Sequence, residues 1–179
     1  MSRLFCAAFA LVAGCYADGA IGATTPVTGP ATEGARGLFA GDIGGGAGII
    51  WNSAGFDVGV SGQRIPAGPE RNGVGPFGRL VFPLGGRDWL QGSIRFALAF
   101  APEDDAGHDS AATSLKLSLG VLAMRVKPDA ESAMGAGPAL SIQTVDVAGV
   151  GRSWFVGLEL SALFGGEILT WSDSDPDDV

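Results

Sequence analysis

The stretch SWFVGLELSALF, residues 153–164, has two unlike sides when it is read as an extended chain. Side chains of a β-strand point alternately to opposite faces. One face then carries Trp154, Val156, Leu158, Leu160, Ala162 and Phe164, and the other carries Ser153, Phe155, Gly157, Glu159, Ser161 and Leu163. The stretch therefore predicts a strand with one oily face and a second face on which Glu159 has small neighbours.

The same two-residue period recurs along most of the chain, and no stretch after residue 37 sustains a helical period. In LQGSIRFALAF, residues 90–100, the alternation is clearest. Within 114–126 and 140–147 the apolar phase slips by one position, which predicts a β-bulge in each. Short turns alternate with longer polar loops, so the pattern predicts an all-β, antiparallel, up-and-down barrel of about eight strands. The expected strands are 39–51, 56–61, 80–84, 90–100, 114–126, 140–147, 154–164 and 168–171.

Composition excludes several classes of protein. The chain has 179 residues, which suits one domain, and 30 of them are glycine. Charged residues make up 17%, against about a quarter in an average soluble domain. With 11 Lys plus Arg and a net charge of −8, the chain lacks the basic footprint of a nucleic-acid-binding protein.

Both ends of the chain lack the two-residue alternation of apolar and polar residues. Arg3 precedes an uncharged, mostly apolar run, so residues 1–15 are expected to be a signal peptide. Its end, Val12-Ala13-Gly14-Cys15, resembles the bacterial lipobox, which implies lipidation of Cys15 at the mature N-terminus. Ordinary cleavage after Cys15 or Ala17 is the alternative. Residues 19–36 are predicted to be a flexible linker and 172–179 an acidic disordered tail, on either side of a barrel domain at 37–171.

The less oily faces of the strands are sparse, small and mixed in charge. Such a face suits the inside of a narrow closed barrel, where side chains from all strands converge. The charged side chains expected inside are Asp57, Arg95, Lys116 and Glu159, with Arg95 or Lys116 neutralising Glu159. The oily faces would then point outward into lipid.

With LQGSIRFALAF, MGAGPALSIQ and SWFVGLELSALF, residues 37–171 resemble small bacterial outer-membrane β-barrels. The resemblance implies the outer membrane of a Gram-negative bacterium, contact with membrane lipid and with the assembly machinery, and a structural, anchoring or narrow-pore role. It also implies an aromatic girdle, formed by Trp51, Trp89, Trp154 and Trp171. Two features depart from the pattern: the chain ends in Val179 rather than an aromatic residue, and the long loops fall on the wrong connections. An additional strand before Gly37 would repair the second.

Two alternatives remain open at this level. A soluble periplasmic or lipid-anchored β-sandwich or lipocalin-like barrel would turn the oily face inward and bind a hydrophobic ligand or partner. A membrane-embedded enzyme acting on lipid is the other, and His108, beside Asp109 and Ser110, is its candidate base. Neighbouring residues of one loop rarely have catalytic geometry, so the sequence predicts no catalytic residue, metal or cofactor.

Overall fold

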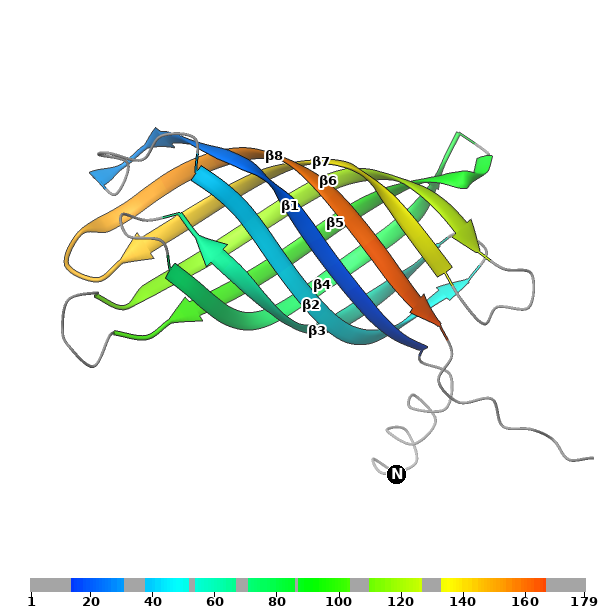
Figure 1. Ribbon diagram of the computed structural model, residues 1–179, viewed down its shortest axis with the longest axis horizontal. Helices are drawn as coiled ribbons and strands as arrows, with labels where there is room; N and C mark the ends of the chain where they lie inside the picture. Colours follow the sequence, from blue (N-terminus) through cyan, green and yellow to red (C-terminus); the bar gives the residue numbers. More distant parts are fainter. Residues whose placement is uncertain are drawn as a thin grey trace, which may run out of the picture.

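The computed structural model describes residues 14–30, 38–51, 54–66, 71–85, 87–103, 110–126 and 133–166. They form eight strands, each paired antiparallel with the next, and the last pairs with the first to close a barrel (Figure 1). The predicted fold class is therefore confirmed. Over the described ranges, no helix has the length and apolarity to cross a membrane. The strands are β1 (Gly14–Thr28), β2 (Leu38–Trp51), β3 (Ala54–Ile65), β4 (Arg71–Leu84), β5 (Arg87–Ala101), β6 (Ala112–Val126), β7 (Ala133–Val147) and β8 (Gly151–Gly166).

The first strand corrects the predicted linker. The sequence predicts a flexible linker over residues 19–36, but β1 occupies Gly14–Thr28 and lies between β8 and β2 (Figure 1). Its apolar alternation is weak because its side chains are mostly small, so its strand character comes from pairing on both edges. The strand before Gly37 that the loop pattern required therefore exists. The predicted last strand, 168–171, lies outside the described residues, and the eight described strands include β1, which the sequence analysis did not predict.

The two predicted bulges are also wrong. β6 pairs with β5 in one unbroken register from Ala101↔Ala112 to Leu90↔Ala123, and the β7–β8 register is equally continuous. Leu122, Met124, Val145 and Val147 thus keep the inward phase of their strands, and all four are buried. The apparent slip arises because the inward-facing residues are polar in the middle of the barrel and apolar near its ends.

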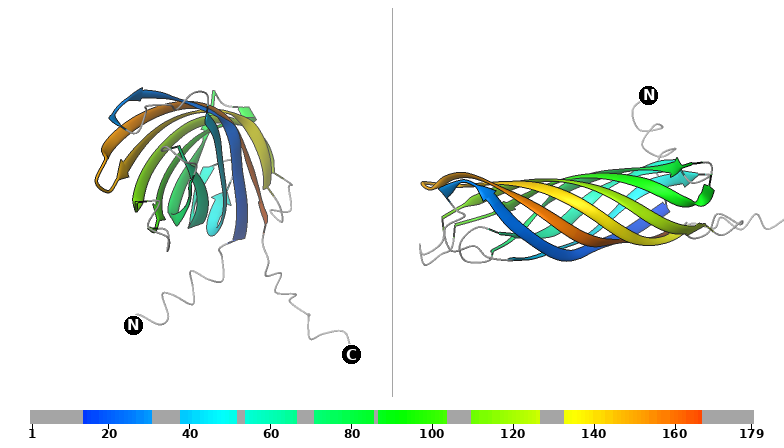
Figure 2. Two further views of the ribbon diagram at one scale, coloured as in Figure 1. Left: turned by 60° about the vertical axis from the view of Figure 1, so that its left-hand side comes forward. Right: turned by 90° about the horizontal axis from the view of Figure 1, so that it is seen from above.

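The antiparallel order gives the barrel two distinct ends. At the terminal end, β1 begins and β8 ends, and the connections β2–β3, β4–β5 and β6–β7 lie there. The opposite end, which we call the loop end, carries the other four connections (Figure 2). The tightest described turn there joins β7 to β8, where the Val150 amide donates to the Val147 carbonyl at 3.0 Å. Gly149 has φ of 76° in that turn, a conformation that side chains other than glycine rarely adopt.

Candidate functional site

The barrel has an apolar outer surface and a polar interior. Leu158 is 62% exposed and its neighbour Glu159 is 3% exposed, so the opening stretch points its oily face outward. The same alternation holds on the other strands, where large apolar side chains are exposed on the outside. The structure also places the four charged residues expected inside, Asp57, Arg95, Lys116 and Glu159, in the interior.

Arg79 is the centre of one half of the interior charge network. Its Nε donates to Asp57 Oδ1 at 3.1 Å, and its Nη2 pairs with Asp57 Oδ2. A further contact joins Arg79 Nη1 to Asp18 Oδ2 at 3.3 Å. Because Asp57 and Arg79 face each other across β3 and β4, this two-point contact follows directly from the strand register.

The other half of the network runs through Lys116. Its Nζ lies 2.6 Å from Asp42 Oδ2 and 2.7 Å from Glu159 Oε1. Glu159 Oε1 also accepts a hydrogen bond from Ser141 Oγ at 2.7 Å. Of the two cations expected to neutralise Glu159, Lys116 is therefore the one that does so.

Arg95 joins the two halves. Its Nε lies 2.7 Å from Asp18 Oδ2, and its Nη1 lies 3.4 Å from Asp42 Oδ1. The guanidinium also packs 4.6 Å from the centre of the Phe77 ring, a distance suited to a cation–π interaction. The result is one continuous chain of ion pairs that crosses the interior from β3 to β8.

The network contains three cations, Arg79, Arg95 and Lys116, and four carboxylates, Asp18, Asp42, Asp57 and Glu159. Its formal charge is thus −1. Removing one partner from a buried ion pair is costly because the other partner stays buried and uncompensated. We therefore regard the network as a device that specifies how the eight strands close. All seven of its side chains are buried.

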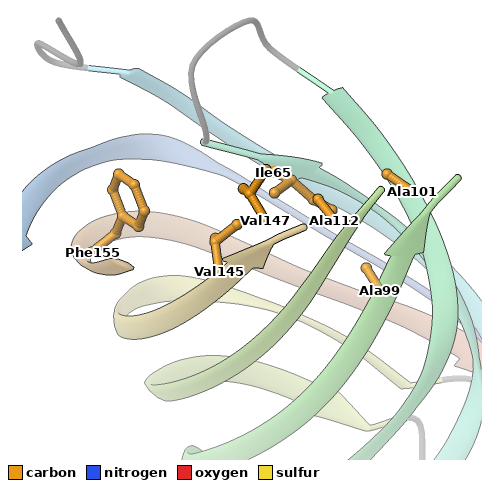
Figure 3. Close-up of a cluster of buried hydrophobic side chains, with 7 residues drawn as sticks. All are labelled: Ile65, Ala99, Ala101, Ala112, Val145, Val147 and Phe155. Carbon is orange, nitrogen blue, oxygen red and sulfur yellow. The ribbon is translucent and has the colours of Figure 1, made fainter. Parts of the chain in front are cut away.

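Apolar clusters cover the network on both sides. At the loop end, the cluster consists of Ile65, Ala99, Ala101, Ala112, Val145, Val147 and Phe155, whose side chains come from five strands (Figure 3). At the terminal end it consists of Tyr16, Val81, Leu122, Met124 and Leu163. Phe155, Ile65 and Leu122 have no exposed surface. An eight-stranded barrel is just wide enough for side chains to fill its interior, and these clusters fill it at two levels.

Glycine at position 44 provides the space for the network. The run Gly44-Gly45-Gly46 lies within β2. A Cβ added to Gly44 would lie against the Asp18 carboxylate and only 3.1 Å from both Phe77 and Ser61. The glycine therefore lets Asp18 and Phe77 approach each other beneath β2.

Sequence reasoning missed three members of the network. Arg79 lies one residue before the expected strand 80–84, within the longer observed strand β4, where it faces the side opposite to Leu80 and Phe82. Asp42 is the one charged residue on the glycine-rich side of β2, and that isolation could have identified it. Asp18 falls between the predicted signal peptide, residues 1–15, and the predicted linker, residues 19–36, a region for which no strand is predicted. The alternation of Tyr16 and Asp18 with small residues was the available clue.

The remaining sequence-predicted residues are placed as follows. Trp89 and Trp154 are exposed on the outside, Trp89 near the terminal end and Trp154 near the loop end. Trp51 ends β2, and Trp171 lies outside the described residues. Cys15, the second residue of β1, is exposed. His108 and its loop lie outside the described residues, and among those described no group of three potential ligands could hold a metal ion.

These features define a closed antiparallel β-barrel with an oily exterior and an ion-paired interior. No known protein family and no curated protein matches the chain. Among solved structures, the chain is similar to the crystal structure of Neisserial surface protein A (NspA), with a TM-score of 0.51 and 18% sequence identity. The alignment covers 87% of this chain and 96% of that chain. At this identity, the similarity concerns the fold alone.

Proposed function

We propose that this protein is an integral β-barrel of the outer membrane of a Gram-negative bacterium. The observation that carries the proposal is the orientation of the two faces, with exposed Leu, Ile, Val and Phe outside and charges inside. In water such an exterior would be a large exposed apolar patch, whereas in a bilayer it would contact the hydrocarbon chains of the lipids. Strands of 12 to 16 residues exceed the 9 to 11 or so that a tilted strand needs to cross a bilayer. The fold similarity to a Neisserial surface protein agrees with this location.

Within that class, a structural or anchoring role fits the interior better than conduction does. An ion crossing the barrel would have to pass both apolar clusters and break the ion pairs between them. Gln91, Ser114 and Ser153, which pair with members of the two clusters, are fully buried, so both layers are tightly filled. The barrel therefore serves to hold the chain in the membrane and to present its loops at the surface.

The soluble alternative requires the opposite orientation. A lipocalin-like barrel binds its ligand in an apolar interior, but here Leu158 points outward and the centre of the interior is occupied by ion pairs. The middle of the interior is thus occupied by ion pairs, and the apolar side chains near its two ends fill the barrel themselves. We do not retain this alternative.

Three finer assignments belong to the same proposal. Trp89 and Trp154, exposed near opposite ends of the barrel, are suited to the two interfaces of the bilayer as parts of an aromatic girdle. Lipidation of Cys15 would place the acyl chains on the outer face at the terminal end, where the exposed thiol lies. Cleavage after Ala17 would instead remove Tyr16, a member of the terminal cluster. Assembly machinery is the expected partner during insertion.

Membrane extraction tests the location and bilayer recording tests the role. The native protein should stay with membranes washed in carbonate, require detergent for release, and change its gel mobility on boiling. Release by carbonate would refute membrane integration. In planar bilayers the folded barrel should give no stepwise conductance, and reproducible single-channel steps would refute the closed interior while leaving membrane integration intact.

A further inference from the structure

Several polar atoms inside the barrel have no hydrogen-bond partner among the described residues. They include Asp18 Oδ1, Ser61 Oγ, Gln63 Oε1 and Arg95 Nη2. Each of these four residues is more than nine-tenths buried. A buried polar group without a partner is costly, and native proteins nearly always supply one from the protein itself or from ordered water.

The three oxygen atoms lie together on one side of the interior. Gly44 of β2 pairs with Asp18 of β1 and with Ser61 of β3, so these residues form one row across the inner wall. Because Gly44 has no side chain, the Asp18 carboxylate and Ser61 both approach the position that its Cβ would occupy. Gln63 follows Ser61 by two positions, so it points inward in the next row, where it pairs with Asp42.

Arg95 of β5 reaches the same place. Its Nε lies 2.7 Å from Asp18 Oδ2 and its Nη1 lies 3.4 Å from Asp42 Oδ1, but no nitrogen of the guanidinium has the geometry of a hydrogen bond. The Phe77 ring, whose centre is 4.6 Å from the guanidinium, also lies 3.1 Å from the position of a Cβ at Gly44. The site is therefore bordered by acceptors on β1 to β3, by donors on β5 and by one aromatic ring.

This mixture of groups determines which ligand can bind. A metal cation would be attracted by the carboxylates of Asp18 and Asp42, but it would lie beside the positive charge of Arg95. An anion would be attracted by Arg95, but it would lie beside the two carboxylates. Water carries no charge, and it can donate to the oxygen atoms and accept from the guanidinium at the same time. Water is therefore the ligand that suits all of these groups.

The two apolar clusters separate this site from both ends of the barrel. Phe155 and Ile65 belong to the cluster at the loop end, and Leu122 belongs to the cluster at the terminal end. All three have no exposed surface. Water between the clusters could exchange with the solvent only when one of these apolar layers opens.

We propose that Asp18, Ser61, Gln63 and Arg95 bind a cluster of ordered water that is trapped between the two apolar clusters. This water completes the hydrogen bonds that the ion-pair network leaves open. The middle of the barrel is then hydrated although the barrel is closed. The inference goes beyond the proposed membrane location and does not depend on it, because every partner of the water lies inside the barrel.

Oxidative labelling of the folded barrel in detergent tests this site. An X-ray pulse forms hydroxyl radicals from water wherever it lies, including inside a protein, and the radicals oxidise the nearest side chains. Iron–EDTA with peroxide forms the same radicals in the bulk solvent only. Phe77 is the reporter beside the site, and Phe155 is the matched control in the apolar cluster at the loop end. We expect X-rays to oxidise Phe77 several-fold more than Phe155, and iron–EDTA to oxidise neither.

Three variants connect the signal to the proposed residues. Ser61→Val and Gln63→Leu each replace a partner of the water by an apolar side chain, and each should lower the X-ray oxidation of Phe77 several-fold. Ser93→Val is the control, because Ser93 is a buried serine that pairs with Val81 in the cluster at the terminal end, and it should leave the oxidation of Phe77 unchanged. Boiling-dependent gel mobility shows which variants form the barrel.

Three results would overturn the proposal. Equal X-ray oxidation of Phe77 and Phe155 in the native protein would mean that no water lies beside the site. Oxidation of Phe77 by iron–EDTA would mean that the interior is open to solvent. Unchanged oxidation of Phe77 in a folded Ser61 or Gln63 variant would mean that these side chains do not hold the water. The first two comparisons use the native protein, so they remain decisive even where a variant does not fold.

Discussion

The interior network predicts that the two partners of the Lys116–Glu159 ion pair contribute unequally to the free energy of unfolding, with Lys116 contributing more. Lys116→Met removes the cation shared by Asp42 and Glu159, and Glu159 then keeps only the hydrogen bond from Ser141. The formal charge of the buried network changes from −1 to −2. Removing one partner of a buried pair typically costs about 3 to 5 kcal/mol, and we expect the free energy of unfolding to fall by that amount.

Glu159→Gln should be far milder. The amide oxygen of the glutamine can still accept a hydrogen bond from Ser141 Oγ. Lys116 retains its ion pair with Asp42, at 2.6 Å, and the formal charge of the network changes from −1 to zero. We expect a loss of about 1 kcal/mol, the usual net value of one hydrogen bond. The two substitutions at one ion pair should therefore differ by about 2 to 4 kcal/mol.

Urea unfolding of the barrel in lipid vesicles, followed by tryptophan fluorescence, measures both values. The double variant completes a thermodynamic cycle and isolates the Lys116–Glu159 interaction from the rest of the network. Arg152→Gln is the control, because its pair with Asp146 is exposed and should contribute less than about 1 kcal/mol. Equal losses for Lys116→Met and Glu159→Gln, or a loss below about 1 kcal/mol for Lys116→Met, would refute the view that Lys116 is the cation on which this part of the buried network depends.

Three further predictions test other parts of the molecule. Leu158→Arg, on the outer face, should lower the free energy of unfolding in vesicles by about 2 to 4 kcal/mol; a neutral result would mean that the position does not contact lipid. Intact-mass analysis should find a mature chain that begins at Cys15 and carries acyl groups, and a later N-terminus without them would exclude lipidation. Gly44→Val should prevent formation of the heat-modifiable barrel because its side chain would occupy the space of Asp18 and Phe77, whereas Gly78→Val should fold.

Local alternation was sufficient to predict the architecture. In 90–100 and 154–164, large apolar residues alternate with small or polar ones, and this period alone specifies a strand with two different faces. The scarcity of charge on the less oily face also predicted which face is inside, because only small or paired side chains fit a narrow barrel. Asp57, Arg95, Lys116 and Glu159 could be assigned to the interior for that reason.

The tertiary structure determines several features that the two-residue period does not predict. β1 is a strand because β2 and β8 pair with it on both sides. Its partners lie 14 to 151 residues away in the sequence, and such distant pairing leaves little trace in a segment of small residues. The apparent phase slips at Leu122 and Val145 are apolar layers inside the barrel, which only the closed shape creates. Which cation meets which carboxylate depends on strand register and on the tilt that brings Lys116 of β6 to Asp42 of β2. The sequence alone thus determined the two faces of each strand, while the closed barrel determined which strands and charges meet, because those contacts join residues far apart in the chain.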